Sequence, residues 1–435
     1  MTELLAERFR AFEEALGGAA GSPINTLRRK AMDSFLRLGF PTTRHEDWKY
    51  TNVSSLVNGQ INLGTVTGSS AIAPEDIRKV HFEGLEANIM VFINGRFAPH
   101  SSTILTPVFE MEILSFESAE DKRIDAFYDN FGKYADFDKD AFTALNTAFA
   151  AQGTFIHVPE GKIVELPVVL HFINDCSQDT VMSQPRNLFV VGKGSSLKVI
   201  ETYSTIGGNA GFTNTVTEIV VAEGASVEYV KTNDEGQAAG HVGNTHIFLN
   251  ADSKATTSTI SYGGAVTRNN LRFTLSGDRA EARMYGLFIG KGKSLIDNHT
   301  VADHQAPATF SDELYKGLMA DKSTGVFNGQ ILVRRAAQQT NAFQSNRNIL
   351  LSDDASINTK PQLEIFADDV KCSHGATTGT LDEEPLFYLR ARGLSEDDAR
   401  QLLLHAFITE VPEKISIEQV RASVEQRLES FLAGK

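Results

Sequence analysis

The sequence contains little cysteine, with only Cys176 and Cys372 in 435 residues. Two thiols cannot form the multi-bridge framework that holds small secreted domains together, which excludes a disulfide-rich fold. The chain also lacks a long unbroken hydrophobic run, and its first residues, MTELLAERFRAFEEAL, predict an amphipathic helix with charges throughout. We therefore expect no membrane span and no secretory signal, and we predict a cytoplasmic protein in a reducing compartment.

Basic residues are also in the minority. The chain has 41 Lys and Arg against 55 Asp and Glu, which gives a formal net charge of −14. Nucleic acids and anionic membranes attract basic surfaces, so neither is expected as a main partner. The remaining composition, with 41% hydrophobic and 22% charged residues, indicates a globular chain long enough to bury at least one sizeable core.

The pattern of hydrophobic residues divides the chain into three regions. The N-terminal region is predicted to be mainly helical, because apolar residues recur at helical spacing from Leu27 to Leu38 before Gly39 ends the helix. Another helix is predicted for residues 138–150. The three predicted regions are 1–150, mainly helical; 151–380, a β-helix core; and 381–435, helical.

Short alternating runs broken by Gly, Asn and Asp fill the central region. In NNLRFTLSGD, the apolar residues Leu271, Phe273 and Leu275 face one way and polar residues face the other. A Gly or Asp opens successive strands at residues 194, 224, 252 and 278, at intervals of 30, 28 and 26 residues. This nearly constant period of strand and turn, without intervening helices, argues against a βαβ architecture and predicts a β-helix.

The segment QQTNAFQSNRNILL adds a polar alternation to this pattern. Gln344, Asn346 and Asn348 recur at every second position of a predicted strand. Amide side chains in stacked strands can hydrogen-bond along the stack. The same spacing also fits the solvent-facing side of an ordinary strand, and both interpretations stay open at this point.

The C-terminal region returns to helical patterns. EEPLFYLRARG ends at Gly393, and Ser395 is predicted to cap the following helix. That helix carries Leu402, Leu403, Leu404, Ala406, Phe407 and Ile408. This is more apolar surface than a lone helix can leave in water, so the helix must pack on its own neighbours or on a partner.

The stretch GLFIGKGKS, residues 286–294, is similar to a phosphate-binding loop but lacks its spacing. The position five residues before Gly292 holds Leu287 instead of glycine, and the residues that follow do not predict a helix. We therefore expect no ATP site in this chain, and any ATP in its biology would be bound by another chain.

The sequence also holds two histidine pairs with a spacing of five, His241 with His246 and His299 with His304. On an uninterrupted strand the two members of each pair would face opposite sides, so a shared metal would require a bulge or turn between them. We expect solvent or core histidines. Asp297 and Asp303 could act as an acid and a base beside the second pair, but their spacing gives no support for that role.

The most informative short stretch is DDVKCSHGATTG, residues 368–379. Cys372 and His374 are separated by one residue, so on a strand they share a face and could contact one metal or one another. The pair could supply metal ligands, a nucleophile with its base, or a structural contact. Two ligands are too few for a closed zinc or iron–sulfur site, so further ligands would have to come from elsewhere.

Several motifs together resemble the SufB/SufD family, the scaffold subunits of the SUF iron–sulfur cluster assembly machinery. They are FPTTRHEDWKYTN at residues 40–52, the stretch NRNILLSDDASINTKPQLEIFADDVKCSHGATTG, and LFYLRARGL shortly after it. Residues 60–150 contribute little to the resemblance. The sequence Lys-Cys-Ser-His-Gly and the low cysteine content resemble the SufD type, because SufB-type chains carry Glu beside this histidine and more cysteines.

The resemblance implies a right-handed parallel β-helix flanked by helical regions. It also implies a non-catalytic scaffold that pairs with a SufB-like subunit and recruits a SufC-like ATPase. A transient iron–sulfur cluster would form at the subunit interface, with His374 as a ligand and Cys372 beside it. The C-terminal helices would bind the ATPase, here through Leu402, Leu403, Ala406 and Phe407.

Two other functions fit a β-helix. One is a polysaccharide hydrolase or lyase, although no cluster of catalytic carboxylates is recognisable in the sequence. The other is a purely structural, self-associating protein, because the open end of a β-helix exposes backbone donors and acceptors. A homodimer could form in this way when a SufB-like partner is absent.

Overall fold

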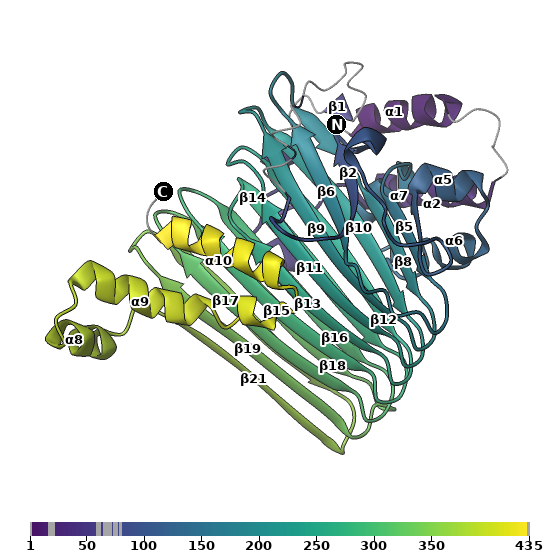
Figure 1. The fold of residues 1–435 in the computed structure, drawn as a ribbon. Helices are drawn as coiled ribbons and strands as arrows, with labels where there is room; N and C mark the ends of the chain where they lie inside the picture. The colour runs from purple at the N-terminus through teal and green to yellow at the C-terminus, as the bar shows by residue number, and fades with distance from the viewer. Residues whose placement is uncertain are drawn as a thin grey trace.

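The computed structural model describes residues 2–15, 22–57, 62–63, 72, 77 and 81–432. It shows a β-solenoid of about 8 turns with helices in the N-terminal and C-terminal parts of the chain (Figure 1). The predicted mainly β class and the predicted parallel β-helix are therefore confirmed.

Two parallel sheets form the solenoid, and the chain alternates between them. From β8 onward, each strand pairs in parallel with the strand two positions further along, so every turn contributes one strand to each sheet. Sheet A contains β4 (Glu112–Ser115), β5 (Thr154–Val158), β8 (Arg186–Val191), β10 (Gly211–Val221), β12 (Gly240–Leu249), β14 (Val266–Leu275), β16 (Leu295–His304), β18 (Thr324–Val333) and β20 (Ser356–Ile365), with the short strand β7 (Val181–Ser183) beside β10 and β1 (Asn62–Leu63) beside β7. Sheet B contains β2 (Asn88–Ile93), β3 (Arg96–Phe97), β6 (Val168–Asp175), β9 (Ser196–Ile206), β11 (Ser226–Asp234), β13 (Lys254–Ser261), β15 (Glu281–Gly290), β17 (Phe310–Met319), β19 (Thr340–Leu350) and β21 (Val370–Gly379).

The predicted repeat corresponds to successive strands of sheet B. The register aligns Ser196, Ser226, Lys254 and Glu281, the first residues of β9, β11, β13 and β15. In three of the four preceding turns the recurring Gly or Asp takes a left-handed backbone, whereas in the fourth Arg279, with a φ value of 58°, takes it in place of Asp278. Gly194, Gly224 and Asp252 have φ values of 63°, 67° and 57°, a region that glycine adopts freely and aspartate tolerates.

Alternate side chains of each strand point into the solenoid and form its core. Leu271, Phe273 and Leu275 belong to this core, as their alternation predicted. The amide side chains also point inward, because all three are buried: Gln344, Asn346 and Asn348. The solvent-facing interpretation of these amides is therefore wrong. The Asn346 side chain donates a 3.2 Å hydrogen bond to the backbone oxygen of the residue opposite it on β17.

The N-terminal helices cover part of the outer face of sheet A. The predicted helix over 138–150 is observed as α7, which begins after its cap Asp140, and α2 ends at Gly39 as predicted. Phe35 and Phe142 pack in one buried cluster with Phe212 of β10. The elements are α1 (Thr2–Ala15), α2 (Pro23–Leu38), η1 (Glu46–Trp48), α3 (Ser54–Val57), η2 (Pro99–Ser101), α5 (Phe116–Asp121), α6 (Asp125–Asn130) and α7 (Ala141–Ala148).

The segment FPTTRHEDWKYTN runs onto the later strands of sheet A. The Arg268 guanidinium of β14 lies 3.9 Å from the centre of the buried Trp48 ring. Arg268 also donates to the Asp47 backbone oxygen at 2.5 Å. Glu46 reaches the last strand of the sheet, where it forms a 2.7 Å ion pair with Lys360. This segment therefore connects the N-terminal helices to the C-terminal end of the solenoid.

α10 crosses the outer face of sheet B, α9 packs on it through Leu404 and Ile408, and α8 projects beyond it (Figure 1). Val420, Val424 and Leu428 of α10 are buried together with Ile200 and Val230 of the strands beneath. The predicted helical C-terminal region is thus observed, and its elements are α8 (Glu383–Ala391), α9 (Glu396–Ile408), η3 (Pro412–Lys414) and α10 (Glu418–Leu432).

Close packing inside the solenoid leaves no room for a side chain at Gly286. A Cβ atom added to Gly286 would overlap the ring of Tyr315, which is fully buried in the next turn. We expect Gly286→Ala to lower the free energy of unfolding by about 1–3 kcal/mol, because a close-packed core cannot yield without strain. Urea unfolding would measure it.

The matched control for this change is Gly208→Ala. A Cβ at Gly208 would meet nothing within 4 Å, so this variant should unfold like the unmodified protein. Equal stability of the two variants would contradict the packing argument.

Candidate functional site

The last turn of the solenoid leaves both sheets open at one end. β20 pairs only with β18, and β21 pairs only with β19, among the residues that the structure describes. Most residues of β21 are exposed. Unpaired N–H and C=O groups of an edge strand can pair with a strand of another chain. This open end, which we call the terminal turn (β20 and β21), is therefore a natural docking surface.

Cys372 and His374 lie on the terminal turn and face the same way. In the β19–β21 ladder Cys372 is opposite Ala342 and His374 is opposite Gln344. Ala342 and Gln344 both point into the solenoid, so the two β21 side chains continue the inward-facing rows beyond the last covered turn. The structure thus brings the predicted pair together at the open end.

The two side chains differ in their surroundings. Cys372 is half-buried and packs against a small apolar cluster with Val333 and Ala342, whereas His374 is exposed. Burial raises the pKa of the Cys372 thiol, so the free side chain is a neutral thiol at neutral pH. A bound metal would favour its deprotonation, because the thiolate is the ligating form.

A row of polar side chains leads from His374 into the covered interior. Gln344 is opposite His374 in one ladder and opposite Glu313 in the next. The Gln344 Nε2 atom donates a 2.8 Å hydrogen bond to Glu313 Oε2. Burial raises the pKa of Glu313 to about 7. The sequence analysis did not identify Glu313. The available signal was its spacing from Tyr315, because residues two positions apart on a strand face the same way.

A second buried polar cluster lies deeper in the solenoid, around Glu201. This carboxylate accepts hydrogen bonds from Tyr203 Oη at 2.7 Å and Tyr229 Oη at 2.8 Å. Burial lowers the pKa of neighbouring Lys231 to about 8. Leu197 and Val199 give this strand its inward parity, which places Glu201 inside as well. The satisfied hydrogen bonds indicate a structural role for this cluster.

The histidine pairs are split between the two faces of their strands, as their spacing predicted. His241 and His304 are buried, and His304 bonds to Thr309 and Ser311 at 2.8 and 2.9 Å. In the described part of the chain, no three His, Cys, Asp or Glu side chains gather as a metal shell.

The two aspartates beside the second pair are held in ion pairs. Asp297 is buried; its burial opposes ionisation, but the Arg268 guanidinium at 2.7 Å lowers its pKa to about 2. Asp303 is paired with Arg272 at 2.8 Å and with Arg334 at 2.9 Å. Both groups stabilise the outer face of sheet A, which argues against an acid–base role.

The helix α9 presents two different faces. Leu404 and Ile408 are buried against the solenoid, while Leu402 and Ala406 are exposed and Leu403 and Phe407 are partly buried. Phe407 also contacts the solenoid, because Lys316 Nζ lies 4.6 Å from its ring centre and donates to its backbone oxygen. Of the four predicted partner contacts, Leu402 and Ala406 are thus the most available.

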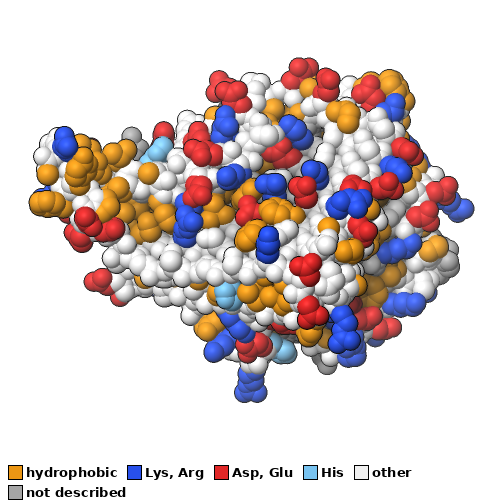
Figure 2. All heavy atoms as spheres, turned by 90° about the horizontal axis from the view of Figure 1, so that it is seen from below, with side chains coloured by type: hydrophobic (Ala, Val, Ile, Leu, Met, Phe, Trp, Pro, Cys, Tyr) orange, Lys and Arg blue, Asp and Glu red, His pale blue; other side chains and the backbone are white. Residues whose placement is uncertain are grey.

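Exposed apolar side chains gather where α8 and α9 project from the solenoid. Figure 2 shows them at the left of the view, the side on which Figure 1 places these helices. Phe387 is 74% exposed, Tyr388 57% and Leu402 50%. A contiguous exposed apolar surface of this kind indicates a protein-binding site.

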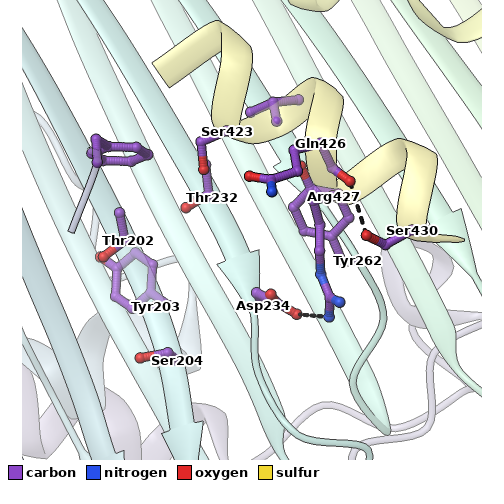
Figure 3. Close-up of a pocket in the computed structure, with 12 residues that line it drawn as sticks. Thr202, Tyr203, Ser204, Thr232, Asp234, Tyr262, Ser423, Gln426, Arg427 and Ser430 are labelled. Atoms are coloured by element: carbon purple, nitrogen blue, oxygen red, sulfur yellow. Dashed lines mark hydrogen bonds and ion pairs between the residues drawn. The ribbon is translucent and has the colours of Figure 1, made fainter. Parts of the chain in front are cut away.

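A cavity of about 280 Å³ lies between α10 and sheet B (Figure 3). Arg427 points from α10 toward the strands and pairs with Asp234 at 2.9 Å. Its guanidinium also lies over the Tyr262 ring, 5.7 Å from the centre. Because Arg427 already has a carboxylate partner, this contact is best interpreted as docking of α10 on the sheet.

The loop of GLFIGKGKS joins β15 to β16, so it connects two strands and precedes no helix.

Both cysteines are free thiols. None of the helices in the described ranges is long and apolar enough to cross a membrane.

The fold and the site together define a parallel β-helix protein that carries a cysteine and a histidine on one face of an open end. Family models match nearly the whole chain: the SufBD protein N-terminal region over residues 2–170, and the SufBD core domain of SUF system FeS cluster assembly over residues 172–407. The chain therefore belongs to the SufBD family of the SUF iron–sulfur cluster assembly system.

Curated relatives agree with this assignment. An iron–sulfur cluster assembly SufBD family protein of Synechocystis is 30% identical over 98% of this chain and 95% of its own. The iron–sulfur cluster assembly protein SufD of Escherichia coli is 30% identical over 96% of this chain and 95% of its own. Protein ABCI7, chloroplastic, of Arabidopsis thaliana is 29% identical over 97% of this chain and 89% of its own. The resemblance of the motifs is confirmed.

The raised pKa of Glu313 predicts a pH-dependent stability. Glutamate has a pKa near ~4.3 in an unfolded chain, and the pKa of Glu313 is about 7 here. The free energy of unfolding therefore falls as the pH rises between these values. Glu313→Gln removes the ionisable group and should raise the free energy of unfolding by roughly 3 kcal/mol at about pH 8, and by less at about pH 5. Urea unfolding at both pH values would measure the difference, and exposed Glu83→Gln is the control. An equal gain at both pH values would contradict the assignment.

Proposed function

We propose that this chain is a non-catalytic scaffold on which an iron–sulfur cluster is assembled together with a second, SufB-like subunit. The observation that carries the proposal is the position of Cys372 and His374 on the inward face of an uncovered turn, between two unpaired strand edges. A second β-helix that docks on those edges would cover the pair. The cluster would then lie at the interface between the two subunits.

The chemistry of the pair suits transient binding of an iron–sulfur cargo. A cysteine thiolate and a neutral imidazole are established ligands of iron–sulfur centres, which take four protein ligands in their closed forms. This chain offers two at the terminal turn, and the partner would supply the rest. A shell that is shared between two chains can open when they move apart, which allows a finished cluster to be released.

The α8–α9 surface supports a role in recruiting a SufC-like ATPase. Phe387, Tyr388 and Leu402 are solvent-exposed on a projection, while Leu404 and Ile408 fix α9 to the solenoid. Aromatic and aliphatic anchors of this kind dominate binding energy at protein interfaces. Movement of a docked ATPase would be transmitted through these helices to the solenoid.

Two further expectations belong to the same proposal. A reducing cytoplasm suits a protein whose two cysteines are free thiols. In the absence of a SufB-like partner, the unpaired edges of β20 and β21 would favour a homodimer through the same terminal turn.

The site assignment predicts the effect of His374→Ala. Removal of the imidazole should abolish iron–sulfur maturation in cells that depend on this chain, because the shared shell loses a ligand. Folding and ATPase binding should be unchanged, since His374 is exposed. Activity of a cluster-dependent reporter enzyme would measure it, with Thr377→Ala, on the other face of β21, as control. Normal maturation in the His374 variant would remove His374 from the site.

The docking assignment predicts a different defect for Leu402→Asp. A charge in the middle of the exposed apolar surface should weaken ATPase binding by about tenfold or more, the loss typical of an interface anchor. The neighbouring exposed substitution Gln401→Ala should leave affinity unchanged. Titration calorimetry with the purified ATPase would measure both, and unchanged affinity of the Leu402 variant would exclude this surface.

A further inference from the structure

The amide of Gln344 is held in one orientation from within the solenoid. Its Nε2 atom donates to Glu313 Oε2 at 2.8 Å. Above its pKa of about 7, Glu313 is a carboxylate that can only accept, so the NH₂ group of the amide then faces Glu313. The side chain also packs against the backbone of Gly329 on the opposite sheet, where an added Cβ would overlap Nε2. These two contacts fix the amide plane.

The other end of the same amide has no partner. Gln344 is 4% exposed, and its Oε1 atom is a buried acceptor without a hydrogen-bond donor among the described residues. Nε2 bonds to Glu313 of β17, on the covered side of β19, so Oε1 is the amide atom left for a donor from elsewhere. The next side chain in that row belongs to His374, which is opposite Gln344 in the β19–β21 ladder. In-register residues of adjacent parallel strands lie about 4.8 Å apart.

We propose that Gln344 is the positioning residue for His374, accepting the N–H of one imidazole nitrogen at Oε1 so that the other nitrogen presents its lone pair to the cargo. Histidines that bind metals usually donate their second ring nitrogen to an acceptor in the protein, which fixes the tautomer and the ring orientation. Glu313 acts one step further back by holding the amide in place. This inference rests on the proposed function, because it assigns a purpose to the ring of His374.

The buried unpartnered oxygen is the reason to assign this role to Gln344. An unpaired buried acceptor costs free energy, and the row offers one neighbour on the open side, His374, that can satisfy it. Docking of a partner on the terminal turn would also exclude water from the pair and strengthen the bond. The support for His374 is therefore built into this chain before any partner binds.

The tautomer of His374 tests the proposal without any cluster. The isolated chain is labelled with ¹⁵N-histidine, and long-range ¹H–¹⁵N spectra are recorded at about pH 8, where ordinary imidazole is neutral. The His374 signals are identified by their loss in His374→Ala. We expect one dominant tautomer in the unmodified chain. Gln344→Met, which keeps the size of the side chain and removes the acceptor, should shift the tautomer ratio about fivefold, the effect of one ordinary hydrogen bond.

Three further variants make the outcome decisive. Gln344→Asn retains an amide that is too short to reach both neighbours, and Gly329→Ala displaces the intact amide, so each should shift the ratio in the same direction as Gln344→Met. Ser345→Ala, on the adjacent outward-facing position of β19, should leave it unchanged. Circular dichroism and thermal unfolding identify the variants that fold. An identical His374 tautomer ratio in the unmodified chain and in every folded Gln344 or Gly329 variant would overturn the proposal.

The two proposals can fail separately. If Gln344→Met leaves the tautomer unchanged while His374→Ala abolishes maturation, the positioning role is wrong and the scaffold site stands. If the tautomer depends on Gln344 but cells with the His374→Ala variant mature clusters normally, the positioning contact is real. The assignment of His374 as a ligand of the cluster is then wrong.

Discussion

The register between successive turns determines where every functional side chain of this molecule lies. Because each strand is paired in parallel with the equivalent strand of the next turn, a side chain stacks over its counterpart and inherits its inward or outward direction. Glu313, Gln344 and His374 form one such row. The row passes from the dry interior to the open end without a change of direction, so the core and the candidate site are parts of one continuous stack.

A β-helix must end, and the two ends of this one are treated differently. At the first turns, helices such as α7 and the extra strands β3 and β4 lie against the sheets. At the last turn, the structure describes nothing that pairs with β20 or β21 on their outer side. Exposed edges invite association with other chains, and globular proteins usually protect them. Their retention beside Cys372 and His374 is the feature that connects the fold with the proposed assembly role.

Much of the fold could be predicted from the residues. The Gly and Asp residues before the strands revealed the repeat, because the turns need backbone angles that few residues adopt, and Leu271 to Leu275 gave the inward parity. The pairing of Cys372 with His374 followed from their spacing. The alternation of Gln344 to Asn348 could not decide between interior and surface, because amides occur in both. Glu313 and Glu201 were missed, because a carboxylate inside a core is recognised only when the partners that surround it are known.

The docking of the N-terminal segment has a consequence for the order of folding. Glu46 and Asp47 leave the ribosome early, yet their partners Lys360 and Arg268 lie 314 and 221 residues further along the chain. Contacts over such separations close late, since the intervening chain must be ordered first. During synthesis this segment can therefore dock fully only after β14 and β20 have been made, so its contacts with Arg268 and Lys360 depend on nearly the whole solenoid being in place.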